Sequence, residues 1–142
     1  MSILDPWMKL LLRVVACFNI SAGLFMIFAT RYAYRMIGMN KPDINFPLQL
    51  VGILVALLGW GYYLVARDPI RNRNLLLIGF WSKALGSVLG TYYILIGRLP
   101  WTFFFVYLFA DIVYLPPFWA ILRRIDRVEA RREAENAGDS GR

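Results

Sequence analysis

The stretch "LLLIGFWSKALGSVLGTYYILI", residues 75–96, is long and apolar enough to cross a bilayer as a helix. It contains a single charged residue, Lys83, well inside the apolar run. A charge at that depth is costly unless it is paired or neutralised. The stretch therefore predicts a membrane-spanning helix that contacts a polar partner elsewhere in the protein.

The composition as a whole is that of a membrane protein. The chain has 142 residues, enough for one domain, of which 59% are hydrophobic and 18% charged, and its mean hydropathy is +0.53. A soluble domain of this size cannot bury so much apolar surface. The absence of histidine and the single cysteine, Cys17, exclude an intrachain disulfide and remove the usual ligands of zinc, haem and iron–sulfur sites, so no metal or cofactor is expected.

Four apolar segments predict an all-α, polytopic four-helix bundle. They cover residues 7–29, 48–66, 75–96 and 101–122, and none shows the alternation of a membrane barrel strand. Residues 1–122 are thus one transmembrane domain. Residues 123–142 are expected to extend the fourth helix by two or three charged turns and to end in a disordered tail. The first half of the loop "TRYAYRMIGMNKPDINFP" fits a short interfacial helix.

The distribution of basic residues predicts the orientation. Ten lie on one side: Lys9, Arg13, Arg67, Arg71, Arg73, Arg123, Arg124, Arg127, Arg131 and Arg132. Four lie on the other: Arg31, Arg35, Lys41 and Arg98. By the positive-inside rule both termini are cytoplasmic. The formal charge of +7 is then explained by topology and by contact with anionic membrane lipids, and nucleic acid is not an expected partner.

Asp111 in the fourth segment is the expected partner of Lys83. At about 1.5 Å per residue, Lys83 lies roughly 12 Å and Asp111 roughly 16 Å from the inner helix ends. The turn "GRLP" is short enough to make the third and fourth helices antiparallel neighbours. Asn19 in the first helix lies at a similar depth, so it is expected as a neutral third member of this polar core. The alternative is that Lys83 extends to the inner headgroups while Asp111 is protonated or faces another subunit.

Several further residues are candidates for packing or binding. Tyr107 and Tyr114 lie one helical turn on either side of Asp111 and fit either hydrogen bonding to it or ordinary aromatic packing. Pro116-Pro117 is expected to kink the helix one turn after Asp111 and to free backbone carbonyls there. Small residues predict close helix contacts, either within the bundle or between two copies of the chain. They are Ser82, Gly86 and Gly90 in the third helix, beside a face of Gly79, Lys83 and Ser87, and Gly52, Ala56 and Gly59 in the second.

A layout of four short helices, with "GWGYYLVARDPIRNR" at residues 59–73 and "GFWSK" at residues 79–83, resembles the DoxX-like class of small bacterial membrane proteins. The resemblance covers most of residues 8–122 and depends on the overall layout and on Gly61 to Pro69. It implies the bacterial cytoplasmic membrane and accessory or quinone-linked roles in respiratory and redox complexes. It supplies no catalytic residues.

Three functions follow as hypotheses. The first is a non-enzymatic subunit or accessory protein of a membrane complex whose polar core fixes packing. The second is a proton-coupled or lipid-like small-molecule carrier, assembled as a homo-oligomer, in which Asp111 is the titrating group. The third is a contribution to a quinone site, with Trp81, Tyr107 and Tyr114 as an aromatic slot.

Overall fold

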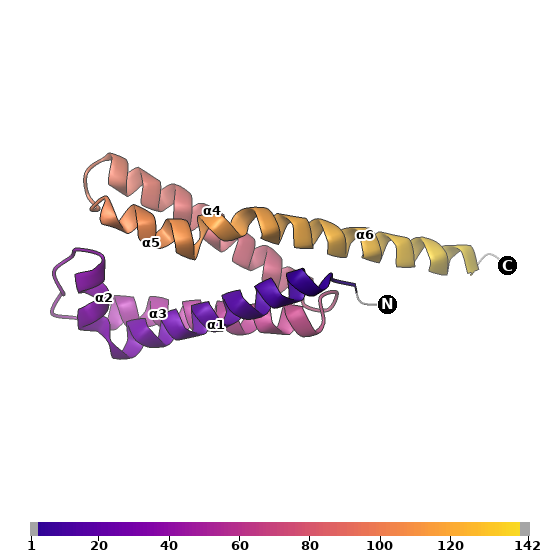
Figure 1. Cartoon of the computed structure of the whole chain (residues 1–142), viewed down its shortest axis with the longest axis horizontal. Coiled ribbons are helices and arrows are strands. Elements are labelled where there is room, and N and C mark those ends of the chain that lie inside the picture. Colours follow the sequence, from indigo (N-terminus) through magenta and orange to yellow (C-terminus); the bar gives the residue numbers. More distant parts are fainter. Residues whose placement is uncertain (1–2, 140–142) are drawn as a thin grey trace.

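The computed structural model describes residues 3–139 and is all-α over that range, as the sequence predicts. Its elements in chain order are α1 (Pro6–Phe28), α2 (Thr30–Met36), α3 (Phe46–Arg67), α4 (Arg73–Leu95), α5 (Thr102–Ala110), the 3₁₀ turn η1 (Ile112–Tyr114) and α6 (Leu115–Asp139) (Figure 1). Within the described residues, four helical segments are long and apolar enough to cross a membrane. These are α1, α3, α4 and the combined segment that begins with α5.

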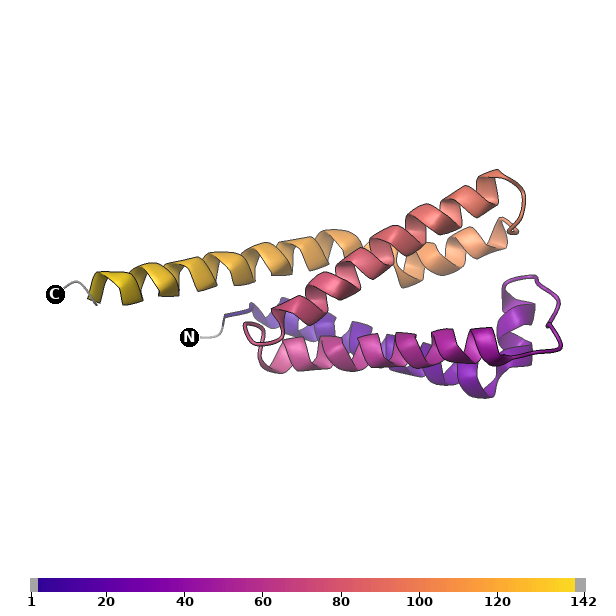
Figure 2. The same ribbon diagram turned by 180° about the vertical axis from the view of Figure 1, so that it is seen from behind.

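The spanning helices form two hairpins. The first pairs α1 with α3, and the second pairs α4 with α5 and the start of α6 (Figure 1). Figure 2 shows α4 crossing away from α3, so the ribbons of the two hairpins approach each other at one end and diverge toward the other. We call these the terminus end, where α1 begins and α6 leaves the bundle, and the loop end, where α2 and the α4–α5 turn lie.

Glycines bring α1 and α3 into backbone contact. A Cβ atom added to Gly52 would lie 2.7 Å from the Gly23 carbonyl oxygen, and one added to Gly59 would lie 2.9 Å from the Ala16 carbonyl oxygen. Such distances leave no room for a side chain, and small residues permit this approach where lipid removes the hydrophobic drive for helix association. Gly52, Ala56 and Gly59 therefore pack within the bundle, against α1.

The hydrophobic core lies at the terminus end and joins the two hairpins. Fully buried members come from all four spanning segments, such as Leu12 of α1, Tyr62 of α3, Leu76 of α4 and Phe118 of α6. The rings of Tyr62 and Phe118 meet edge to face at 5.0 Å between centroids. The contact that holds the hairpins together is thus confined to one half of the molecule.

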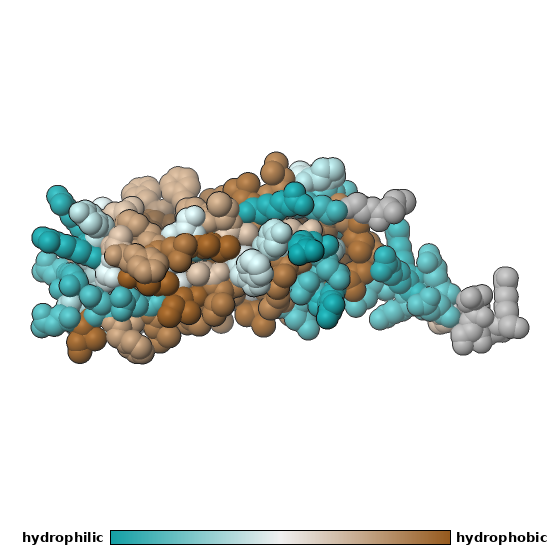
Figure 3. Space-filling view, turned by 90° about the horizontal axis from the view of Figure 1, so that it is seen from below, coloured by the Kyte–Doolittle hydropathy of each residue, from teal (hydrophilic) through white to brown (hydrophobic). Residues whose placement is uncertain are grey.

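The surface supports a membrane-embedded arrangement. On the face shown in Figure 3, hydrophobic side chains predominate between the loop end and the terminus end of the bundle, and hydrophilic side chains gather at both of these ends and along the C-terminal extension. α1 begins and α6 ends at the same end of the molecule, as an even number of crossings requires (Figure 1). The short helix α2 occupies the first half of the 30–47 loop, where the sequence predicts an interfacial helix.

The fourth segment differs from the expected helix in two respects. It is interrupted at Asp111, and it continues as α6 to Asp139, well beyond the two or three turns expected after Leu122. The extension is held to the bundle by ion pairs from Arg73 to Asp126 and from Arg124 to Asp5. The helical extension expected for residues 123–142 thus reaches Asp139, and residues 140–142 of the expected tail lie outside the described range.

Candidate functional site

Lys83 and Asp111 meet as an ion pair between α4 and the α5–η1 break. The Lys83 Nζ atom donates to the Asp111 Oδ1 atom at 2.7 Å and to the Ala110 carbonyl oxygen at 2.8 Å. Lys83 is only 5% exposed, whereas the Asp111 side chain is 30% exposed. The lysine therefore turns inward to its partner and does not extend to the headgroups.

The break in the fourth segment supplies the second acceptor. In a continuous helix the Tyr114 N–H would donate to the Ala110 carbonyl oxygen. Here it donates to the Asp111 carbonyl oxygen at 3.1 Å, in a 3₁₀ turn, and Ala110 accepts from Lys83 instead. A bilayer offers no water to an unpaired carbonyl, so the lysine satisfies a group that the break releases.

Pro116 and Pro117 explain where the break falls. Each lacks the N–H that would donate to the residue four positions earlier, and its ring crowds that carbonyl. Those positions are Ile112 and Val113, which lie in the 3₁₀ turn. The kink expected one turn after Asp111 thus begins at Asp111 itself, because a proline disturbs the turn that precedes it.

Two tyrosines pack around the pair in different ways. The Lys83 Nζ atom lies 5.6 Å from the centroid of the Tyr114 ring, within the range of a cation–π contact. Tyr107 is buried, and its hydroxyl shares a hydrogen bond of 2.9 Å with the Thr91 hydroxyl. Within residues 3–139 neither tyrosine hydroxyl donates to Asp111, so Tyr114 contributes its ring and Tyr107 connects α5 to α4.

The buried face of α4 carries the lysine and small residues next to it. Ser87 donates to the Lys83 carbonyl oxygen at 2.8 Å, and both residues are buried together with Gly79 and Gly90. A Cβ atom on Gly90 would lie 3.3 Å from the Tyr107 ring. This face, one lysine among small residues, is what allows α5 to approach the charge.

Asn19 is buried but belongs to a different contact. Its amide donates to the Val15 carbonyl oxygen of its own helix at 2.9 Å, and α1 packs against α3. The hydrogen bonds of Lys83 within the described residues go to Ala110 and Asp111. The expected triad is therefore a pair, because equal depth in the membrane does not place α1 beside α4.

Ser82 and Gly86 lie away from the bundle. Both are exposed, and nothing within the described chain lies within 4 Å of a Cβ atom built on Gly86. Gly90, which continues their four-residue spacing, is buried against Tyr107. The expected stripe is thus divided between two faces of α4, since residues four apart drift around a helix of 3.6 residues per turn.

Tyr62 belongs to the site, although the sequence analysis does not single it out. It is fully buried, its ring lies against Gly79 one turn before Lys83, and its hydroxyl has no hydrogen-bond partner within the described residues. A buried hydroxyl without a partner is uncommon in proteins. The signal that could have found it is Gly79, whose missing side chain provides the space.

Trp81 lies on a different face of α4 from the side that Tyr107 and Tyr114 contact, the two tyrosines with which it is expected to form an aromatic quinone slot. Trp81 is exposed on α4 and its rings contact Phe80, whereas Tyr107 and Tyr114 lie on the side of the fourth segment that faces Lys83. Trp81 and Lys83 are two positions apart in a helix, so their side chains point to different faces.

Chemically, the site can hold two helices together. The Asp111 carboxylate is partly exposed and accepts one hydrogen bond from Lys83, so it retains acceptor capacity for a polar ligand. Among residues 3–139 no group of three histidine, cysteine or acidic side chains is placed to hold a metal ion.

Comparison with known proteins adds no relative to this description. No family model matches the chain, no curated protein matches it, and no solved structure matches it.

Proposed function

We propose that this protein is a non-enzymatic small subunit or accessory protein of a bacterial cytoplasmic-membrane complex, with both termini in the cytoplasm. The proposal agrees with the DoxX-like layout of the sequence. In it, the Lys83–Asp111 pair keeps the second hairpin in a defined shape, and a neighbouring membrane helix packs against the outer face of α4.

The observation that carries this proposal is the uncovered outer face of α4. Its large apolar side chains are exposed around the two small residues Ser82 and Gly86. They are Trp81, Leu85, Val88 and Leu89. Small residues between large side chains leave a shallow depression, and a second membrane helix can approach closely at such a place.

Extraction into native nanodiscs tests the proposal. A tagged chain should purify in an assembly larger than its own 16.4 kDa. Gly86→Leu should release it from that assembly without lowering its unfolding free energy, because no atom of another helix in residues 3–139 lies within 4 Å of a Cβ at this position. Val14→Leu on the exposed face of α1 is the matched control and should leave the assembly intact. A partner-free monomer in native lipid, or equal loss with both variants, would contradict the proposal.

A proton-coupled carrier is the second candidate, and one observation favours it. A titratable carboxylate at a helix break, partly exposed and within 2.7 Å of a lysine, is the arrangement in which transporters place coupling sites. Proteoliposomes with a pH-sensitive dye inside should then show proton flux that Asp111→Asn abolishes and Asp43→Asn, in the exposed loop, leaves unchanged. Equal flux in the wild type and in Asp111→Asn would eliminate this role.

A further inference from the structure

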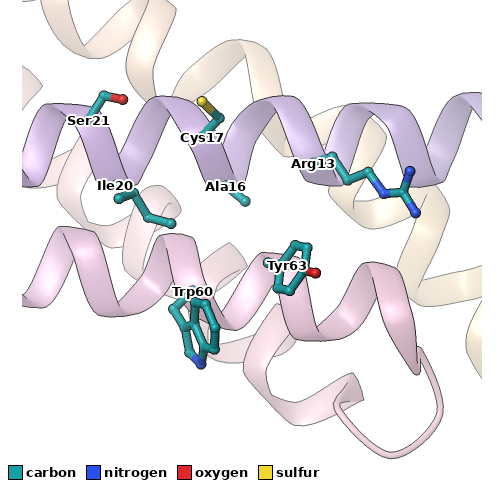
Figure 4. Close-up of a pocket in the computed structure, with 7 residues that line it drawn as sticks. All are labelled: Arg13, Ala16, Cys17, Ile20, Ser21, Trp60 and Tyr63. Carbon is teal, nitrogen blue, oxygen red and sulfur yellow. The ribbon is translucent and has the colours of Figure 1, made fainter.

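A groove between α1 and α3 opens on the outside of the first hairpin (Figure 4). Its volume is about 390 Å³, and its floor is formed by Ala16 and Ile20. Exposed side chains border it on both helices: Arg13, Cys17 and Ser21 from α1, and Trp60 and Tyr63 from α3. It is separate from the Lys83–Asp111 pair, none of whose residues line it.

Arg13 places a charge in this otherwise apolar groove. It lies seven residues after the first residue of α1, which at 1.5 Å per residue is about 10 Å along the helix. The ion pairs within residues 3–139 involve Arg73, Lys83 and Arg124, and Arg13 has no acidic partner among them. A cation beside hydrocarbon requires an anion or water, and the chain does not provide the anion.

The Arg13 guanidinium group and the Tyr63 hydroxyl lie toward one end of the groove. Figure 4 shows the Arg13 guanidinium group and the Tyr63 hydroxyl directed toward the same end of the groove, with Ser21 and Ile20 at the other. That is the terminus end, since Arg13 precedes Ile20 in α1. Trp60 lies beside the groove. Tryptophan is one of the residue types that are enriched at membrane interfaces.

We propose that this groove binds one anionic phospholipid. The lipid phosphate accepts hydrogen bonds from Arg13 and from the Tyr63 hydroxyl, and one acyl chain lies over Ala16 and Ile20 beside Trp60. Charge complementarity selects an anionic lipid, because the groove presents a cation and no acidic residue. The groove volume fits an acyl chain, because sites for one small molecule span roughly 300–1,000 Å³. A second helix with its side chains is about 10–12 Å across and is too wide to enter the groove.

Quenching by brominated lipid tests this assignment at Trp60. The protein retains Trp60, and its other tryptophans (Trp7, Trp81, Trp101 and Trp119) are replaced by phenylalanine. In phosphatidylcholine bilayers, Trp60 should be quenched by brominated phosphatidylglycerol with about fivefold higher apparent affinity than by brominated phosphatidylcholine, the effect expected for one cation near anionic lipid. Equal affinities for the two lipids would overturn the proposal.

Two variants separate a built site from general surface charge. Arg13→Gln should abolish the preference, and Arg67→Gln, which removes another exposed arginine at the terminus end, should preserve it. Equal loss in both variants would refute a specific site. If the single-tryptophan protein does not fold, native mass spectrometry of otherwise unchanged protein gives the same answer. Arg13→Gln should then lose one retained phosphatidylglycerol that Arg67→Gln keeps, and an unchanged lipid count would again refute the proposal.

Discussion

Removing one member of the Lys83–Asp111 pair should destabilise the bundle more than removing both. Asp111→Asn leaves a lysine that is 5% exposed without its counter-ion, and Lys83→Met leaves Asp111 charged at a helix break. Breaking a buried pair costs about 3–5 kcal/mol. We expect the lower end, about 3 kcal/mol for each variant, because Ala110 still accepts from Lys83 and because Asp111 is partly exposed.

The double variant measures the pair itself. With neither charge present, Lys83→Met combined with Asp111→Asn should lose no more than either single variant, since the double variant leaves no uncompensated charge. The coupling energy is then at least about 3 kcal/mol, far above the roughly 0.6 kcal/mol average for hydrogen bonds between membrane helices. A value near that average would mean that the pair acts as a neutral hydrogen bond.

Reversible unfolding in mixed dodecyl maltoside and SDS micelles, followed by tryptophan fluorescence, gives the required free energies. Lys41→Met and Asp43→Asn are matched controls, because they remove the same charges from the exposed loop after α2. They should each change the unfolding free energy by less than about 0.5 kcal/mol. The reasoning is refuted if the losses of the two single variants add in the double variant to within about 0.5 kcal/mol.

Four further predictions follow from the packing. Gly52→Val should destabilise the bundle by at least about 2 kcal/mol, because its Cβ would lie 2.7 Å from the Gly23 carbonyl oxygen, whereas Gly86→Ala should be neutral in the same unfolding assay. Tyr107→Phe should cost about 1 kcal/mol in the wild type but almost nothing beside Thr91→Val, and equal costs in both backgrounds would mean that their hydroxyls do not interact. Replacing Pro116 and Pro117 by alanine should move the carbon chemical shifts of Ala110 and Asp111 to α-helical values in solid-state NMR, and unchanged shifts would assign the break to another cause. In a Cys17→Ser background, Asn40→Cys and Glu133→Cys should react with an impermeant maleimide from opposite faces of the membrane, and reaction from one face would contradict four crossings.

Much of the fold is predictable from the sequence because lipid imposes a strong local rule. A segment that crosses hydrocarbon must satisfy its backbone internally, so length and apolar composition alone define helices such as residues 75–96. The meeting of Lys83 and Asp111 is predictable for a related reason. Two helices joined by a short turn are neighbours, and their depths follow from the helical rise.

The sequence by itself therefore determined the all-α fold class, the four apolar segments long enough to cross a membrane, and Asp111 as the partner of the buried Lys83. Tertiary structure alone decided which helices touch: Asn19 lies at a suitable depth but on a helix that packs elsewhere, and Ser82 and Gly86 have a packing spacing but face outward. Pro116 and Pro117 place the break locally, but only the packing of α4 against α5 brings Lys83 to the Ala110 carbonyl oxygen that the break releases. Depth and periodicity are properties of one helix, whereas rotation about the helix axis and the choice of neighbour depend on the packing of the whole bundle.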